Sequence, residues 1–226
     1  MKKIFFLTVF VLSTLTFTSC VTSVHPLATY RTATTDQRIT GLWTSDEQLI
    51  VIEPFLQSNF GKELQRSLGK ENKPFVITGD ASKDSILFNR MYLYSTTQNN
   101  ITYYMAGGLV KLGNDLFAEL YPLHVQDSRH EDPLAFHNNF LPSFTVAKLE
   151  WSGNGQMTMK FINGDFIAEQ VRRGRVRLKH EKNELFGTFT ITAPSEELQL
   201  FLEKYGNDER MFSKDQTVVL KRKPVT

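Results

Sequence analysis

Cys20 is the residue whose type and position point most directly to defined chemistry. It is the only cysteine in the chain, so it has no partner for an intramolecular disulfide. It lies just after an apolar run, residues 4–15, and before a polar segment that is rich in Thr, Ser and Ala. A lone thiol at such a junction therefore has no structural role in a disulfide, and its reactivity is available for another purpose.

Residues 1–19 have the composition of a secretory signal. Lys2 and Lys3 form a basic tip, an apolar segment follows, and Thr18 and Ser19 are small polar residues before the cysteine. A helix that spans a bilayer needs about 20 apolar residues, and the polar residues here come too early for one. The sequence therefore predicts a secretory signal that directs export of the chain.

The end of this signal, Thr18-Ser19-Cys20, resembles the lipobox of bacterial lipoproteins, in which a small residue precedes an invariant cysteine. Phe17 stands where that family usually has Leu. The resemblance covers residues 1–20 and implies that the chain is cut before Cys20, that the thiol receives a diacylglyceryl group and that the new amino end is acylated. Two or more acyl chains give stable membrane anchoring. An ordinary cleaved signal peptide and a retained signal-anchor helix are the alternatives.

Residues 21–24 bear on the membrane to which such an anchor is delivered. In bacterial lipoproteins an Asp just after the cysteine favours retention in the inner membrane, and a charged cluster directs some members to the cell surface. The sequence Val-Thr-Ser-Val has neither feature. The resemblance therefore implies a lipid-anchored protein of the outer membrane that faces the periplasm.

Aromatic residues in the most strand-like part of the chain are candidates for ligand binding. Tyr92, Tyr94, Tyr103 and Tyr104 lie close together in the sequence, and Trp43 belongs to an earlier predicted strand. A tyrosine offers a flat apolar face and a hydroxyl, which suits an apolar or amphipathic ligand. The alternative is ordinary sheet packing through cross-strand aromatic pairs.

Two polar groups are weaker candidates for binding sites. His124, His130 and His137 share a loop with three carboxylates, which could hold zinc; the alternative, which the lack of a tight His pairing favours, is a solvated polar loop. Four basic residues, Arg173, Arg175, Arg177 and Lys179, alternate and would share one face of a strand. Such a face could bind lipid phosphates or an acidic glycan, or it could protect a solvated edge strand from aggregation.

Charge and motif content exclude several classes of function. The chain has 26 basic and 24 acidic residues, and removal of the signal with its two lysines leaves 24 of each, so nucleic acid is not an expected partner. The sequence contains no G-x-S-x-G nucleophile motif, no Gly-rich phosphate loop and no dinucleotide fingerprint. No cofactor is predicted. A hydrolase built on paired carboxylates stays possible, because such pairs meet only in the folded chain.

The remaining chain divides into a predicted tether at 20–37 and a single mainly β domain at 38–226. Residues 22–37 lack apolar periodicity and read as a flexible tether. Apolar alternation predicts strands at 39–43, 49–53, 86–96, 101–112, 116–121, 144–151, 156–162, 175–180, 185–192 and 217–220. Helices are predicted at 163–174, with Asn163 as the cap, and at 194–205, which carries an apolar stripe; 55–73 is ambiguous. Gly107-Gly108 predicts a bulge or bend in a curled sheet.

Gly41-Leu42-Trp43 resembles the G-x-W opening of lipocalins and other calycin barrels. In those proteins the Trp plugs the closed end of the barrel, and an Arg near the C-terminus packs over it. Arg210 and Arg222 are both candidates for that role here. The predicted fold is thus a mainly β antiparallel curled sheet or lipocalin-like barrel, with one or two short helices and a C-terminal amphipathic helix.

These observations favour a non-enzymatic, membrane-anchored protein of the cell envelope that binds an apolar or amphipathic small molecule. The alternatives are an envelope-assembly or protein-interaction role, with the basic strand or the His-rich loop as the docking surface for other envelope proteins, and a periplasmic hydrolase.

Overall fold

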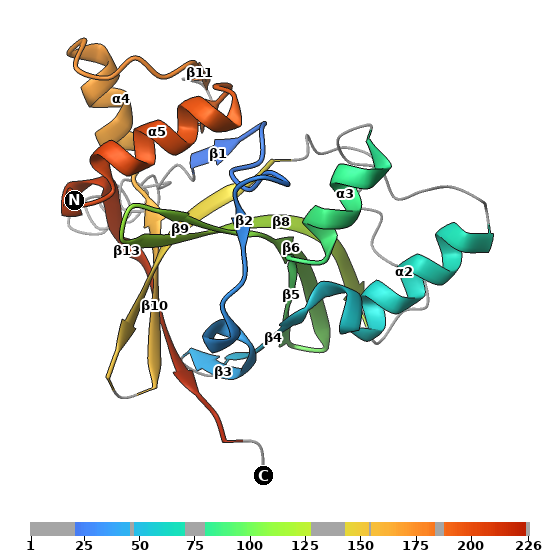
Figure 1. Cartoon of the computed structure of the whole chain (residues 1–226). Helices are drawn as coiled ribbons and strands as arrows, with labels where there is room; N and C mark the ends of the chain where they lie inside the picture. The colour runs from blue at the N-terminus through green and yellow to red at the C-terminus, as the bar shows by residue number, and fades with distance from the viewer. Residues whose placement is uncertain are drawn as a thin grey trace, which may run out of the picture.

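The structure, a computed structural model, describes residues 21–45, 48–70, 80–127, 143–153, 155–183 and 188–224 (Figure 1). Cys20, His130 and His137 lie outside these residues. The strands are β1 Val21–Ser23, β2 Ala33–Thr34, β3 Gly41–Ser45, β4 Gln48–Pro54, β5 Tyr92–Gln98, β6 Ile101–Gly107, β7 Leu109–Leu112, β8 Asp115–Asp127, β9 Thr145–Ser152, β10 Gln156–Ile162, β11 His180–Asn183, β12 Thr188–Ile191 and β13 Phe212–Arg222. The helices are η1 Gln37–Ile39, η2 Phe55–Gln57, α2 Asn59–Lys70, α3 Ala81–Phe88, α4 Gly164–Arg172, α5 Ser195–Tyr205 and η4 Glu209–Met211.

The large sheet closes on itself into an eight-stranded antiparallel barrel. Its strands follow the order β8-β6-β5-β4-β3-β13-β10-β9, and pairing between β8 and β9 completes the ring, with Ala118 opposite Ala147. Strand β7 continues the line of β6 along β8, and β2 adds to β7. The predicted mainly β fold class is confirmed, and the curled sheet is a closed barrel.

Tight turns join neighbouring strands at the breaks between the strands predicted at 86–96, 101–112 and 116–121. Gly113 has a φ of 59° in the β7–β8 turn, and Asn99 and Asn100 have φ values of 51° and 66° in the β5–β6 turn. These are the positive φ values that two-residue hairpin turns require. β6 ends at Gly107 and β7 begins at Leu109, and a Cβ on Gly107 would lie 2.0 Å from the carbonyl oxygen of Glu119. The strand is interrupted at the predicted glycine pair, while its register shift against β8 lies between Tyr104 and Met105.

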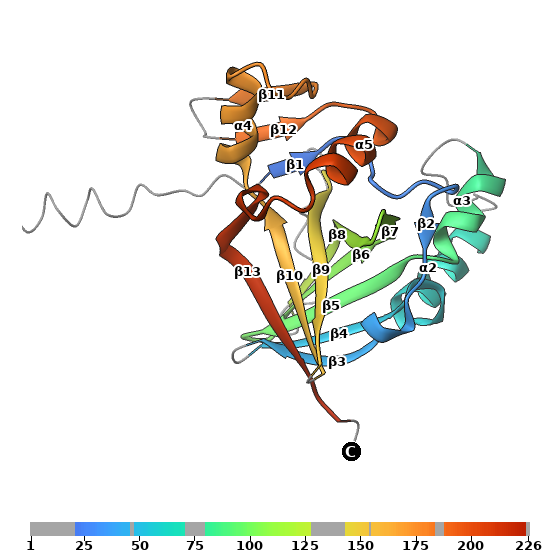
Figure 2. The same ribbon diagram turned by 60° about the vertical axis from the view of Figure 1, so that its left-hand side comes forward.

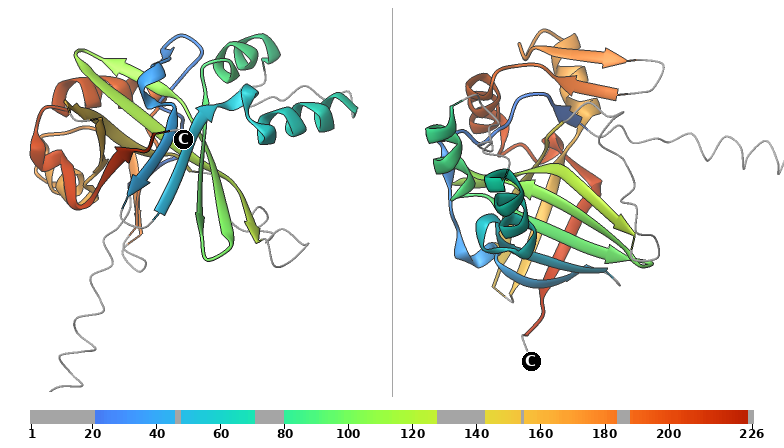
Figure 3. Two further views of the ribbon diagram at one scale, coloured as in Figure 1. Left: turned by 90° about the horizontal axis from the view of Figure 1, so that it is seen from below. Right: turned by 90° about the vertical axis from the view of Figure 1, so that its right-hand side faces the viewer.

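Helices and a small second sheet surround the barrel (Figures 2 and 3). The sheet has the order β1-β12-β11, and together with α4 and α5 it lies at the end of the barrel opposite the C-terminal end of β13. Helices α2 and α3 pack on the outside of the barrel wall. Asn163 caps α4, as predicted, by accepting hydrogen bonds from the backbone N–H groups of Asp165 and Phe166. None of the described helices is long and apolar enough to cross a membrane.

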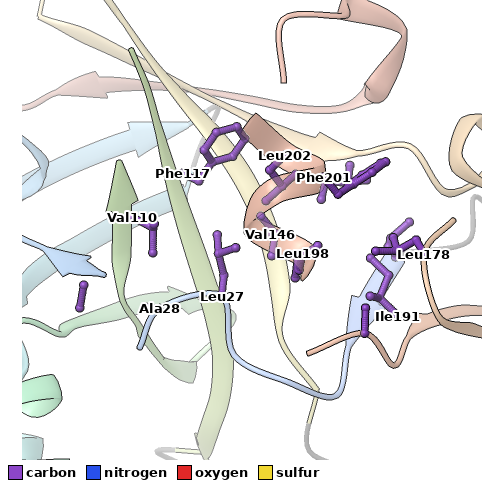
Figure 4. Packing of buried hydrophobic residues seen from close by; sticks show 14 of the residues in the cluster. Leu27, Ala28, Val110, Phe117, Val146, Leu178, Ile191, Leu198, Phe201 and Leu202 are labelled. Atoms are coloured by element: carbon purple, nitrogen blue, oxygen red, sulfur yellow. The ribbon is translucent and has the colours of Figure 1, made fainter. Parts of the chain in front are cut away.

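Two separate apolar clusters fill the protein. The first lies between the outer face of the barrel and the helices, and Figure 4 shows Phe201 and Leu202 of α5 packed beside Phe117 and Val146 of the barrel. The second draws buried side chains from strands all around the closed sheet, including Trp43, Tyr94, Ala118, Ala147, Met157 and Leu220. Since every wall of the barrel contributes to it, the second cluster is the barrel interior.

The predicted flexible tether at 22–37 is wrong. Strand β1 pairs in parallel with β12, placing Val21 opposite Phe189, and β2 pairs with β7. Leu27 and Ala28 are completely buried, and Figure 4 shows Leu27 beside Val146 and Leu198. The segment has no strand or helix periodicity because it crosses the outer face of the barrel as an irregular strap, held by hydrogen bonds rather than by one apolar face.

Three predicted strands are also wrong in part. The strand predicted at 39–43 begins only at Gly41, because Ile39 ends the short helix η1. Residues 86–88 belong to α3, which Asp80 caps through the backbone N–H groups of Ser82 and Lys83, and β5 begins only at Tyr92. Residues 175–179 join no sheet, and β11 begins at His180. Val176 and Leu178 are buried while Arg175, Arg177 and Lys179 are exposed. The alternation of apolar and basic residues in this segment therefore follows from burial of one side and not from pairing with another strand.

Candidate functional site: the barrel interior

Strand register places four of the five predicted aromatic residues on the inner face of the barrel. Trp43 lies opposite Ile50, and the same row continues through Thr96 to Tyr103. Tyr94 and Tyr92 belong to the same face of β5 as Thr96, since side chains two residues apart share a face. Trp43 is 1% exposed and Tyr94 2% exposed, while Tyr103 is 40% exposed. The structure therefore brings Trp43, Tyr92, Tyr94 and Tyr103 together on one surface.

Tyr104 lies on the opposite, outer face. Its ring stacks on Phe60 of α2 at 5.2 Å between centroids and lies 6.2 Å from the ring of His124. His124, the one described member of the predicted His-rich loop, is thus part of an aromatic contact between β8 and α2. Within the described residues no group of three His, Cys, Asp or Glu side chains could hold a metal ion.

The barrel interior is closed at one end by Trp43 and Arg222. The Arg222 guanidinium carbon lies 4.4 Å from the Trp43 ring centroid, and its N–H groups donate to the backbone oxygens of Thr40, at 2.8 Å, and Arg38. The Trp43 indole N–H donates to the Ile39 oxygen at 2.8 Å. Of the two arginines that the sequence offers for this role, Arg222 takes it.

Gly41 completes this closed end. Its φ is +131°, and a Cβ at this position would lie 2.7 Å from a terminal nitrogen of Arg222. A side chain would therefore strain the backbone and displace the guanidinium. Arg38 covers the second tryptophan in the same way, with its guanidinium carbon 4.3 Å from the Trp151 ring centroid.

Three polar atoms on the inner face are buried without a hydrogen-bond partner among the described residues: Tyr94 Oη, Thr96 Oγ1 and Trp151 Nε1. Burial raises the pKa of Tyr94, so its hydroxyl stays protonated and is a donor. Buried polar groups in proteins almost always have a partner, because an unpaired one loses its water without compensation. All three can donate a hydrogen bond to something inside the barrel.

The apolar part of the inner face is incompletely packed. Ile50, Met105, Leu116, Trp151, Phe161 and Val218 contact the buried interior cluster but keep part of their surface accessible. At the end away from Trp43, Phe161 and Val218 line a pocket of about 250 Å³ together with Val21, Thr145, Ile162 and Gln216. The interior therefore has an accessible apolar mouth at one end and an arginine-covered floor at the other.

The four basic residues predicted as a binding surface lie together but not on a strand. Arg173 is the C-cap of α4, and Arg175, Arg177 and Lys179 follow in the connection to β11. All four side chains are exposed, and Arg173 pairs with Glu169 at 2.5 Å. They form a solvated surface between α4 and β11, at the end of the barrel where the mouth lies, and none of the four lines the pocket.

Glu119 is a buried carboxylate that the sequence reasoning missed. It projects from the outer face of β8, is 2% exposed, and accepts the backbone N–H groups of Leu27 at 2.5 Å and Ala28 at 3.1 Å. A Cβ on Gly108 would lie 3.2 Å from its Oε1 and 2.6 Å from the Ala28 Cβ, so glycine makes room for the contact. The signal in the sequence is a lone acid inside an otherwise apolar strand, Leu116 to Tyr121.

Glu119 makes stability depend on pH. Burial raises its pKa from 4.5 to about 7, against the opposing effect of the backbone N–H groups of Ala28, Leu27 and Gly108. Because the folded pKa is the higher one, this stabilisation is complete below pH 4.5 and is lost as the pH rises through 7. We expect Glu119→Gln to remove a fall of about 3 kcal/mol in the free energy of unfolding between pH 4.5 and 8, at 1.36 kcal/mol per unit.

Urea unfolding at pH 5 and pH 8 measures this difference, with Glu203→Gln on the exposed face of α5 as the matched control. The control is expected to follow the wild-type profile. A Glu119→Gln profile that also parallels the wild type would show that another group carries the pH dependence.

Comparisons with known proteins give no further guide to this site. No protein-family profile, no curated protein and no solved structure matches the chain. The function is therefore argued from the residues and the geometry described above.

Proposed function

We propose that this chain is a lipid-anchored protein of the bacterial outer membrane, facing the periplasm, whose barrel binds an apolar or amphipathic small molecule without transforming it. The observation that carries the binding role is the inner face itself. It combines accessible apolar side chains with three buried, unpartnered polar atoms, those of Tyr94, Thr96 and Trp151. A pocket with an apolar lining and a few polar groups is the usual form of a small-molecule site.

The polar atoms define which ligands the site favours. An apolar body suits the Ile50, Met105 and Phe161 side chains, and a carboxylate, ester or hydroxyl oxygen can accept from Tyr94 or Trp151. The membrane anchor is supported by the lipobox-like Ser19-Cys20 and by the absence of any other cysteine. We propose no cofactor, and no nucleic acid as a partner.

A titration with a fluorescent fatty acid tests the proposal. Both tryptophans of the chain, Trp43 and Trp151, lie in the barrel interior, so a bound probe that absorbs their emission quenches it saturably. The Cys20→Ala form of the mature chain is used, because it needs no detergent. We expect Tyr94→Phe to weaken binding of the fatty acid by about tenfold, the loss of one buried hydrogen bond of about 1.4 kcal/mol.

The matched control is Tyr104→Phe, which removes the same hydroxyl from the outer face and should leave the affinity unchanged. A hydrocarbon probe of similar length should bind Tyr94→Phe and wild type equally. Quenching that does not saturate for any of these probes would contradict a binding role for the interior.

A further inference from the structure

The apolar pocket at the barrel mouth lies beside the point at which the lipid anchor is attached. Its walls are Val21, Phe161, Ile162 and Val218, with Thr145 and Gln216 as the two polar members, and its volume is about 250 Å³. Val218 pairs with Met159 and Phe161 with Ala147, so both belong to the inner face of the barrel. The pocket therefore opens onto the interior and takes an apolar occupant.

Val21 is held in the pocket wall by the fold. It pairs with Phe189 across β1 and β12 and is 5% exposed. Two residues further on, Ser23 and Phe144 exchange backbone hydrogen bonds of 2.8 Å in both directions. Cys20 directly precedes Val21 in the sequence. A lipid on Cys20 would therefore be tethered one residue from the pocket wall.

We infer that this pocket holds one of the acyl chains carried by Cys20. The inference rests on the lipid anchor proposed above. The acyl chain is tethered within one residue of the pocket, which gives it a high effective concentration over any free lipid. Burial of its methylenes against Val21, Ile162 and Val218 is favourable, and the other chains of the anchor stay in the bilayer. The mouth of the barrel is consequently held against the membrane surface.

Photochemical crosslinking of the anchor tests this inference. Cells that express the full chain are fed a fatty acid with a mid-chain diazirine, and the purified lipoprotein is irradiated in detergent and digested. We expect adducts that join the Cys20 lipopeptide to peptides containing Thr145, Phe161 or Val218. Val218→Trp fills the pocket and should reduce these adducts by about tenfold, because a close-packed wall leaves no space for the chain.

Val219→Trp is the matched control, since Val219 is the next residue on the outer face, is 42% exposed and does not line the pocket. It should leave the crosslinks unchanged. The crosslinks of the wild-type protein test whether the pocket holds the acyl chain even if Val218→Trp folds poorly.

Other outcomes distinguish a failure of this inference from a failure of the proposed lipid anchor on Cys20. Adducts at the same residues with the mass of a free phospholipid would mean that a bilayer lipid occupies the pocket, and would overturn the inference while leaving the anchor intact. A labelled Cys20 without crosslinks to these peptides would likewise overturn the inference and leave the anchor intact. An unmodified Cys20 in the N-terminal peptide would overturn the anchor and the inference together.

Discussion

Trp43→Ala is expected to destabilise the protein by about 4 kcal/mol, the usual range for removal of a fully buried tryptophan being about 3–5 kcal/mol. Trp43 is 1% exposed at the closed end of the barrel. Its loss leaves a cavity, removes the surface on which Arg222 packs, and deprives the Ile39 oxygen of the indole N–H. Urea unfolding measures the loss, and the midpoint of thermal unfolding should fall by about 8–16 °C at about 2–4 °C per kcal/mol for a domain of this size.

Trp151→Ala is the matched control for this prediction. Trp151 is also covered by an arginine, Arg38, but it is only partly buried and its indole N–H has no partner among the described residues. We expect Trp151→Ala to lower the free energy of unfolding by about 1–2 kcal/mol, since a partly buried side chain contributes less buried apolar surface. A cost for Trp43→Ala no greater than that for Trp151→Ala would show that Trp43 does not plug the barrel.

Local features of the fold could be predicted from the sequence because they depend on neighbouring residues. The hairpin around Gly113 and the α4 cap at Asn163 each follow from one turn or cap residue next to an apolar pattern. The alternation in β10 was also sufficient, because Met157 and Met159 on its inner face are buried while the residues between them are only partly covered. The pattern Gly41-Leu42-Trp43 carried information about the barrel floor, because Gly41 leaves space for Arg222.

Closure of the barrel could not be predicted in the same way. It depends on the pairing of Ala118 with Ala147, two small residues far apart in the sequence that carry no local signal for each other. The inner positions of Thr96 and Trp151 are likewise a result of register around the whole ring. The sequence therefore predicted four aromatic residues of the candidate site, namely Trp43, Tyr92, Tyr94 and Tyr103. It did not predict that Thr96 and Trp151 would place buried polar atoms there.

The strap at 22–37 shows the limit of composition as a guide. Its Thr- and Ser-rich sequence is typical of a linker, yet the backbone N–H groups of Leu27 and Ala28 bind the buried Glu119 carboxylate. Such contacts depend on a residue about 90 positions away. They also remove the distance that a flexible segment would place between the barrel and an anchor on Cys20.

Cys20→Ala is expected to move the protein from the membrane fraction to the soluble fraction. Ala cannot accept a diacylglyceryl group, and a chain without its acyl groups loses about 0.8 kcal/mol of membrane affinity per buried methylene. Fractionation of cells fed a labelled fatty acid measures both effects, and label should appear in wild type and be absent from Cys20→Ala.

Ser19→Ala is the matched control, because it keeps a small residue before the cysteine and should leave attachment and labelling unchanged. The intact mass of the wild-type protein then separates the three interpretations of residues 1–20. A chain that begins at Cys20 and carries acyl groups supports the anchor, and an unmodified shorter chain indicates an ordinary signal peptide. A chain that keeps residues 1–19 indicates a retained helix. Because β1 begins at Val21, each result also decides how closely the barrel mouth is held to the bilayer.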